Sequence, residues 1–266
     1  MKNLLTLICV FLCFGCFGFV HAQDVQTLPN AHSHNDYRHD RPTLDALDHG
    51  FCSLEADVFL VDGQLLVGHT PWELKEVNTL EVLYLDRLRE FFQKNDGSIY
   101  PNKEKVVLWI DFKSGPKETW PVLEKVLSNY TEMLSYVEDG KLVEKAVTVI
   151  ITGSSPSPDM FKSETGKRYA LSSDSLDRFD ASIPNTVYYA VCENFAKFTR
   201  WRGYGELSQE DRQKIAEVVK KTHDQGRKIR FWGYPESEKI WQLMLDLNVD
   251  WINTDDHQRL QKFLTK

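Results

Sequence analysis

Short apolar runs alternate with longer amphipathic stretches along most of the chain. Each run has the length of a buried strand, and most of the stretches between them carry apolar residues at the spacing of one helix face. We expect strands over residues 28–31, 51–60, 105–111, 147–152, 168–172, 186–191, 228–232 and 251–253. The nearly uninterrupted apolar run at 105–111 is typical of a parallel strand that is covered on both faces.

The stretches between these runs predict helices. Residues 79–95 place leucines and a phenylalanine on one side of a helix, with polar residues on the other. Residues 208–225 begin at Ser208, a good N-cap residue, and end before Gly226. Further helices are expected over residues 43–50, 119–135 and 236–247. Asp62-Gly63 predicts a hairpin turn before residues 63–67.

Eight strands with helices between most of them predict a single-domain α/β fold, a (β/α)8 TIM-type barrel with right-handed crossovers. The length of 266 residues suits one such barrel, and no stretch has the composition of a linker. A doubly wound open sheet is the alternative, because the helix after the strand at 147–152 is poorly marked. The Ser- and Pro-rich residues 154–158 there have loop composition.

The N-terminal segment differs from the rest of the chain. Lys2 precedes an apolar run over residues 4–20, and Val20-His21-Ala22 fits the small-x-small pattern of a signal-peptidase site. We therefore expect a signal peptide over residues 1–22, an exported (periplasmic or secreted) protein, and one domain over residues 23–266. A retained membrane anchor and lipidation at Cys16 are the alternatives. No stable membrane span is expected after cleavage.

Composition narrows the class of protein. The chain is 42% hydrophobic and 27% charged, which is typical of a globular protein with a sizeable core. Its formal net charge of −7 gives no electrostatic case for binding nucleic acid or an anionic membrane surface. Outside the leader, Cys52 and Cys192 remain, and both a disulfide and two buried thiols are open. No coenzyme motif is present, and no protein partner can be inferred.

Titratable side chains gather where the first predicted strands end. His32 and His34 follow the first strand, Glu55 and Asp57 lie on the second, and His69 follows the hairpin. Residues two apart in a strand share a face at a spacing of about 7 Å, so the two carboxylates can hold one hard cation. Because strand ends converge at one mouth of a barrel, the pattern predicts acid/base residues beside a cation site.

Later strands add charged residues to the same mouth. Asp111 and Lys113 end the strand at 105–111 and share a face, as do Arg230 and Trp232 on the strand at 228–232. Three carboxylates, a lysine and histidines favour phosphoryl transfer, in which cations hold the phosphate while imidazoles move protons. We expect Arg230 to contact the phosphate and Trp232 the alcohol group. Asp255, after the last strand, is expected at this mouth too.

These motifs resemble a known group of enzymes. Ala31-His32, Glu55-x-Asp57 and Gly68-His69 are similar to the glycerophosphodiester phosphodiesterases of the phospholipase C-like phosphodiesterase superfamily. The segment from His32 to Tyr37, with Arg41-Pro42, is more similar to the branch named for the yeast altered-inheritance-of-mitochondria protein. The resemblance implies a TIM-type barrel with one Mg2+ or Ca2+ and a small-molecule or lipid-derived phosphodiester substrate.

The resemblance also implies roles for individual residues. Glu55, Asp57 and Asp111 correspond to metal ligands, Lys113 to a phosphate-binding residue of the catalytic group, and His69 to the general acid. Glycerophosphodiesterases usually carry Glu where this chain has Asp111, which leaves the substrate specificity open.

The general base has two candidates. His32 matches the Ala-His motif of glycerophosphodiesterases, although the Arg-Gly that follows it there is absent here. His34 is followed by Asn35, as in phosphatidylinositol-specific phospholipases C, and this match makes Asn35 a binding candidate. We place His32 slightly ahead and keep both. Direct hydrolysis and a cyclic phosphate intermediate are also both open.

Two other functions remain as alternatives. A metal-dependent amidohydrolase also carries His-x-His after its first barrel strand, but it needs further histidines on later strands. The later ones, His223 and His257, lie in a predicted helix and beyond the last strand. A catalytically inactive barrel that only binds a ligand would have lost a catalytic residue, and none of the motif residues is missing.

Overall fold

The computed structural model describes residues 25–162 and 166–266. All the predicted site residues lie in these ranges. The predicted signal peptide lies outside the described residues.

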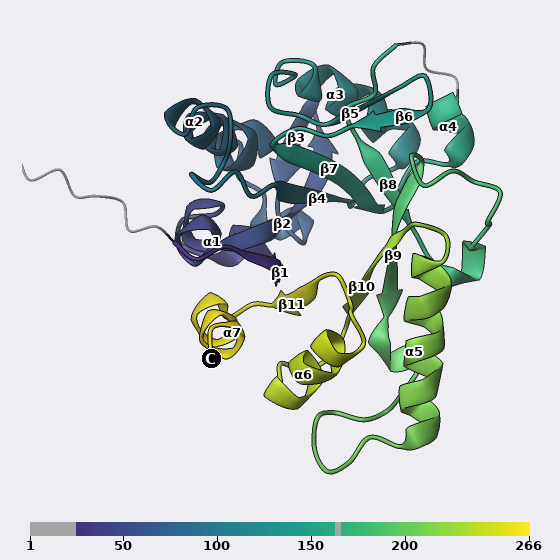
Figure 1. Cartoon of the computed structure of the whole chain (residues 1–266). Coiled ribbons are helices and arrows are strands. Elements are labelled where there is room, and N and C mark those ends of the chain that lie inside the picture. Colours follow the sequence, from purple (N-terminus) through teal and green to yellow (C-terminus); the bar gives the residue numbers. More distant parts are fainter. Residues whose placement is uncertain (1–24, 163–165) are drawn as a thin grey trace, which may run out of the picture.

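Eight parallel strands form the predicted barrel (Figure 1). They are β1 (Leu28–Ser33), β2 (Phe51–Val61), β4 (Val106–Phe112), β7 (Val147–Gly153), β8 (Leu171–Asp174), β9 (Tyr188–Asn194), β10 (Lys228–Trp232) and β11 (Ile252–Thr254). Their order is β10-β9-β8-β7-β4-β2-β1-β11, and a parallel bridge between Arg230 and Trp251 joins the two ends. This nearly closed ring confirms the TIM-type barrel and excludes the open doubly wound sheet.

The predicted hairpin is also present. Strand β3 (Gln64–Val67) runs antiparallel to the end of β2, and Asp62 and Gly63 form the turn with φ values of 47° and 78°. Such positive φ values at both turn positions match the right-handed twist of the two strands. The hairpin returns the chain to the barrel, so that His69 follows close to the end of the barrel wall.

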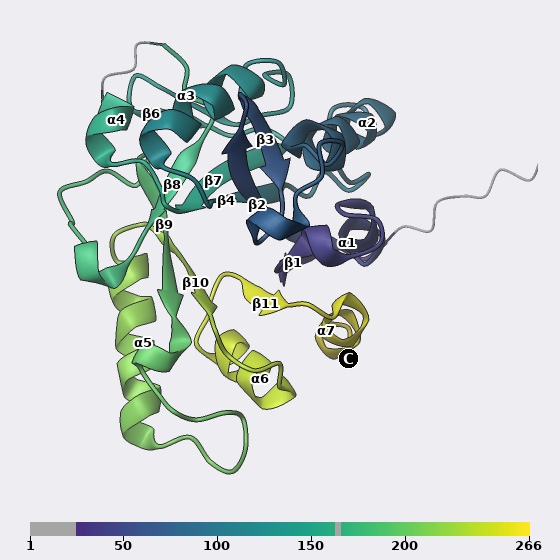
Figure 2. The same cartoon turned by 180° about the vertical axis from the view of Figure 1, so that it is seen from behind.

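Helices lie outside the sheet in both views (Figures 1 and 2). They are α1 (Leu44–Asp48), α2 (Asp86–Lys94), α3 (Pro116–Leu127), α4 (Pro158–Lys162), α5 (Gln209–His223), α6 (Glu238–Asp246) and α7 (His257–Leu264). As predicted, Ser208 caps α5, because its side chain accepts a hydrogen bond from the backbone N–H of Asp211. Among the described residues, no helix has the length and apolarity needed to cross a membrane.

Several segments differ from the prediction, among them α7, which was not expected. The helix expected at 119–135 ends at Leu127, because Ser128 and Asn129 favour a turn over a helix interior. A small hairpin of β5 (Tyr136–Glu138) and β6 (Lys141–Val143) follows it, with strands too short to show a periodic pattern. The helix expected at 79–95 is a π turn over Glu81–Leu85 that continues into α2.

The barrel interior is filled by a small cluster beneath the predicted site. Trp109, Ile150, Ala190 and Trp251 form this cluster, which is separate from the larger core of the molecule. The rings of Trp109 and Trp251 meet edge to face with centroids 5.1 Å apart. Trp109 is paired in register with Glu55, one layer before the pair of Asp57 and Asp111, so these large side chains form a floor under the two aspartates.

Cys52 and Cys192 are both free thiols, so the structure answers the open question of a disulfide between them.

Candidate active site

The predicted carboxylates converge at the carboxyl ends of β2 and β4. Asp57 and Asp111 are direct partners in the register of these strands, and Glu55 lies two residues before Asp57 on the same face. One oxygen of each of the three side chains lies within 4.8 Å of the others. They line a cavity of about 330 Å3, together with His34, Asn35, His69, Lys113, Arg230 and Trp232. Of the residues predicted at this mouth, His32 and Asp255 do not line it.

This cluster suits a hard divalent cation. Its donors are all carboxylate oxygens, which Mg2+ and Ca2+ prefer. Burial, followed by the charge of Asp57, raises the pKa of Asp111 to about 6. Three carboxylates so close together repel one another, and a bound cation would relieve that repulsion.

Gly153, at the end of β7, makes room for Asp111. Its φ is 68°, and a Cβ atom at this position would lie 2.1 Å from Asp111 Oδ1. Only glycine avoids this clash and adopts the backbone angle without strain. The neighbouring strand is therefore shaped around the third carboxylate.

Lys113 bridges two of the carboxylates. Its Nζ lies 3.0 Å from Asp57 Oδ2 and 3.1 Å from Asp111 Oδ1. The ammonium group is mostly buried at the cavity wall.

His69 and Tyr37 both bind Asp57. The Nδ1 atom of His69 and the hydroxyl of Tyr37 each lie 2.8 Å from Asp57 Oδ2. Glu73 accepts a hydrogen bond from the backbone N–H of His69 at 2.6 Å, which fixes the loop. The side chain of His69 is 48% exposed, so its Nε2 edge is accessible to a ligand in the cavity.

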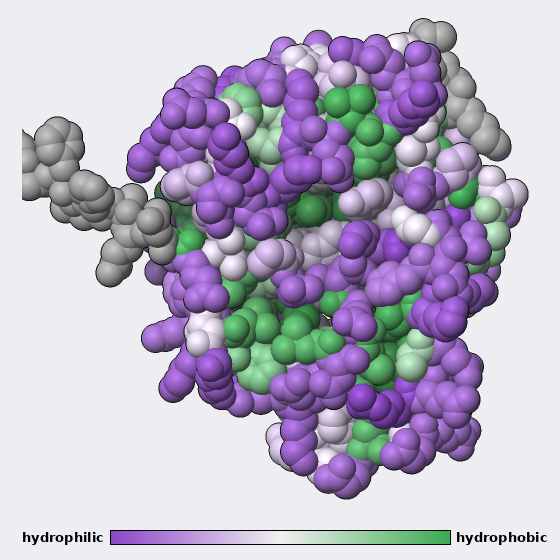
Figure 3. Space-filling view, in the orientation of Figure 1, coloured by the Kyte–Doolittle hydropathy of each residue, from purple (hydrophilic) through white to green (hydrophobic). Residues whose placement is uncertain are grey.

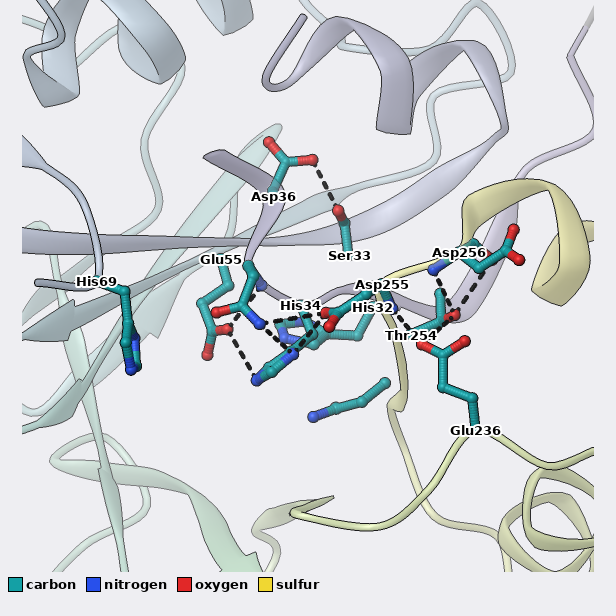
Figure 4. A network of polar contacts seen from close by, with 12 residues as sticks. His32, Ser33, His34, Asp36, Glu55, His69, Glu236, Thr254, Asp255 and Asp256 are labelled. Atoms are coloured by element: carbon teal, nitrogen blue, oxygen red, sulfur yellow. Dashed lines mark hydrogen bonds and ion pairs between the residues drawn. The ribbon is translucent and has the colours of Figure 1, made fainter. Parts of the chain in front are cut away.

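His34 is held between Glu55 and Asp255 (Figure 4). Its Nδ1 lies 2.7 Å from Asp255 Oδ1, and its Nε2 lies 3.7 Å from Glu55 Oε2. Burial acts to lower the pKa of His34, but the hydrogen bond to Asp255 and the charge of Glu55 outweigh it and raise the pKa. In Figure 4, His69 lies on the opposite side of Glu55 from His34.

His32 is buried beneath this layer. Its Nδ1 lies 2.8 Å from Ser53 Oγ, and its Nε2 accepts a hydrogen bond from Arg230. Burial and the charge of Arg230 hold the pKa of His32 well below its ordinary value, so the ring is neutral. Both ring nitrogens are therefore engaged with the protein, and the geometry favours His34 over His32 as the base.

Arg230 forms a buried ion pair with Glu55. Its Nη1 and Nη2 atoms each lie 3.0 Å from Glu55 Oε1, and its guanidinium lies 4.4 Å above the ring of Trp109. Burial acts to raise the pKa of Glu55, but Arg230 and the nearby histidines hold it well below its usual range. The expected phosphate contact of Arg230 stays a prediction, since this side chain is 3% exposed and is occupied by Glu55.

The sequence analysis did not predict the opposite wall of the cavity. It includes Thr152, Ser173, Asp174, Ser175 and Arg178 from β7 and β8 and the residues that follow them. The pairing of β8 with β9 shifts register between Ser172 and Ser173, and such bulges redirect side chains near functional sites. The only sequence signal was polarity at the end of an apolar strand.

Comparison with known proteins places the chain in a family. Residues 21–171 match the AIM6-like phosphodiesterase domain. Altered inheritance of mitochondria protein 6 of Eremothecium gossypii is 30% identical over 91% of this chain and 71% of that protein. Its counterpart in Lachancea thermotolerans is 33% identical over 88% of this chain and 65% of that protein.

A solved structure supports the fold. A glycerophosphodiester phosphodiesterase from Parabacteroides distasonis superposes with a TM-score of 0.56, covering 91% of this chain and 97% of that chain. At 14% identity, this likeness concerns the fold alone.

The expected export of the protein is not supported. The relatives are named for the inheritance of mitochondria, and nothing in these comparisons indicates secretion. The expectation was wrong because it rested on a lysine, an apolar run and a short small-x-small motif. An apolar run indicates affinity for a bilayer, but it does not identify the membrane or the destination of the protein.

The family model matches more than half of the chain, the relatives are similar over most of its length, and the fold is the same kind of barrel. This chain therefore belongs to the AIM6-like phosphodiesterase domain family.

Proposed function

We propose that the chain is a metal-dependent phosphoric diester hydrolase that uses His34 as general base and His69 as general acid. One observation carries this proposal. Two histidines line the same cavity as three clustered carboxylates and a lysine, and each histidine has its Nδ1 on a carboxylate. This arrangement provides acid/base groups beside a site for positive charge, which phosphodiester cleavage requires.

Glu55, Asp57 and Asp111 would hold the cation, Mg2+ or Ca2+. When bound, it supplies positive charge beside the oxygens of the phosphate. Lys113 contributes a fixed ammonium group at the same wall, and its two carboxylate partners keep it charged and oriented. Asn35 and Trp232 line the cavity as further candidates for substrate contact.

Asp255 sets the tautomer of His34. Because His34 donates its Nδ1–H to Asp255, Nε2 is the nitrogen that is free to accept a proton. In the proposed reaction His34 Nε2 accepts the proton of the attacking hydroxyl, which belongs either to water or to the substrate itself.

Asp57 sets the tautomer of His69, as Asp255 does for His34. Its carboxylate accepts the Nδ1–H, so that the exposed Nε2 of the protonated ring faces the cavity. His69 then donates the Nε2 proton to the oxygen of the leaving alcohol. Protonation matters most for alkoxides, which are poor leaving groups.

The geometry does not favour the amidohydrolase alternative. That class uses both histidines of the His-x-His motif as metal ligands, whereas His32 here binds Ser53 and Arg230. Among the described residues, the group suited to a metal contains only carboxylates. The inactive binding barrel is tested directly by activity.

The test is hydrolysis of bis(p-nitrophenyl) phosphate by the purified chain after chelation and after return of each divalent ion. We expect activity that disappears with EDTA, returns with Mg2+ or Ca2+, and is lost in Asp111→Asn. A folded protein that cleaves no diester with any metal would support the binding barrel instead.

A further inference from the structure

A second pocket lies next to the mouth of the barrel. It encloses about 280 Å3 and is lined by Phe195, Ala196, Thr199, Arg200, Trp201, Arg202 and Gly233. Gly233 directly follows Trp232, which lines the catalytic cavity. The two hollows are thus neighbours along the end of β10.

The pocket carries positive charge without internal compensation. Arg200 and Arg202 are both exposed, and neither has a hydrogen-bond or ion-pair partner within residues 25–162 and 166–266. Lys197 nearby is different, because Asp177 and Glu193 neutralise it at 2.6 and 2.9 Å. Although the whole chain has a net charge of −7, the surface at Arg200 and Arg202 is locally cationic.

The loop that forms this pocket has a fixed shape. Trp201 donates its Nε1–H to the carbonyl of Tyr204 at 2.8 Å, and Lys239 of α6 donates to the carbonyl of Gly205 at 3.1 Å. Thr199 donates to Asp211 of α5 at 2.8 Å. The two arginines are thus presented on a loop tied to both neighbouring helices.

Exposed aromatic side chains lie on the same loop as the two arginines and on neighbouring segments of the mouth. Tyr204 is 86% exposed on the same loop, and Trp232 is 41% exposed beside it. Trp72, on the loop that carries His69, is 93% exposed. The connection from β9 to α5 stands out at the bottom of Figure 1, and Figure 3 shows hydrophobic side chains among hydrophilic ones in that region.

We propose that this loop, residues 195–205 with Gly233, docks the mouth of the barrel onto an anionic bilayer, with the pocket binding a lipid phosphate. Unpaired arginines attract anionic headgroups, and tyrosine and tryptophan side chains favour the interface between headgroups and water. Because screening confines this attraction to about 8 Å, the local charge prevails over the distant acidic residues. The proposal concerns binding and does not depend on the proposed reaction.

The test is co-sedimentation of the full chain with phosphatidylcholine vesicles, with and without phosphatidylserine. We expect binding only to the anionic vesicles and a loss of about 30-fold in R200Q/R202Q, from the usual contribution of each surface arginine. The control R87Q/R212Q removes two half-buried, ion-paired arginines of α2 and α5 and has the same net charge as R200Q/R202Q. It should bind like the wild type, and both variants should keep the wild-type midpoint of urea unfolding.

Three results would overturn the docking proposal. One is equal binding of the wild type to neutral and anionic vesicles, and another is unchanged binding by R200Q/R202Q. The third is binding of inorganic phosphate, measured by calorimetry and lost in R200Q/R202Q, by a wild type that binds no vesicles. That result would identify a site for soluble phosphate.

Discussion

His32 and His34 illustrate how far the sequence resolves single residues. The sequence pattern treats them alike, because residues two apart at the end of a strand are expected to share a face. In the structure His32 lies on β1, whereas His34 is the first residue after it. What separates them is depth. His32 lies deeper in the barrel, where Arg230 and Ser53 occupy its nitrogens, whereas His34 lies at the mouth, in the turn that follows β1. That depth depends on contacts from β10, nearly two hundred residues away, which no local pattern contains.

Replacing each histidine separately tests this difference. His34→Gln should lower kcat by about 10²–10⁴-fold, the usual contribution of a general base, with little change in unfolding free energy. His32→Gln should instead lower the unfolding free energy, because it disturbs a buried hydrogen-bonded layer. Initial rates and urea unfolding of both variants distinguish the roles. Equal loss of activity at unchanged stability in His32→Gln would contradict the assignment.

Arg230 gives a second prediction at this scale. Arg230→Met removes the partner of a buried carboxylate and should destabilise the fold by about 3–5 kcal/mol. Arg212→Met, which breaks an exposed pair with Asp246, should cost less than about 1 kcal/mol. Urea unfolding measures both. A small loss for Arg230→Met would mean that Glu55 does not need this charge.

Among the elements, β7 shapes the candidate metal site through Gly153. Gly153→Ala should weaken metal binding by about 10–100-fold, the effect of disturbing the surroundings of a metal ligand. The matched control is Gly140→Ala, where φ is 72° and nothing lies within 4 Å of the added Cβ. Both variants incur the same kind of backbone strain, so titration of thermal unfolding with Mg2+ or Ca2+ isolates the contact with Asp111. Equal affinity in the two variants would contradict it.

Helix α7 attaches to the first strand through a cluster of histidines. The ring of His257 stacks on that of His39 with centroids 3.8 Å apart, and its Nε2 lies 2.6 Å from Ser33 Oγ. The sequence analysis placed His257 beyond the last strand, and the structure shows it buried at the first position of α7. Burial, with the charges of His39 and His49, lowers the pKa of His257 to about 3.

This cluster predicts a pH dependence of stability. Below the unfolded pKa of about 6.5, the unfolded chain protonates His257 and the folded chain does not, so stability falls with pH down to about 3. Between about pH 7 and pH 4 the wild type should lose about 3 kcal/mol more than His257→Gln. Asp36, whose pKa is raised by burial to about 6, acts in the opposite direction in both proteins. Urea unfolding at the two pH values measures the difference, and parallel losses would contradict it.

At the scale of the whole molecule, the alternation of strands and helices was enough to predict the barrel. Buried parallel strands carry a strong local signal, and the order of the ring follows from right-handed connections. The β5–β6 hairpin and α7 were missed because short elements at the edge of the barrel depend on packing more than on pattern. The far wall of the cavity was missed for the same reason, since the bulge at Ser173 is a feature of pairing with β9.

Net charge was the least informative property. A total of −7 argued against binding to anionic surfaces, yet Arg200 and Arg202 form an exposed cationic patch beside the mouth. Charges act over about a Debye length, so the distribution decides what a surface attracts. The N-terminal segment was misleading in a similar way, because hydrophobicity alone does not specify a destination.

The central claim is that His69 protonates the leaving alcohol of a phosphodiester. The most direct measurement compares wild type and His69→Gln on bis(p-nitrophenyl) phosphate and on a glycerophosphodiester, in saturating Mg2+ or Ca2+. The nitrophenolate leaves without a proton, so we predict that the variant keeps most activity on it and loses about 10²–10⁴-fold on the alkyl diester. Equal losses on both substrates, or no turnover of either diester by folded wild-type protein, would contradict the account.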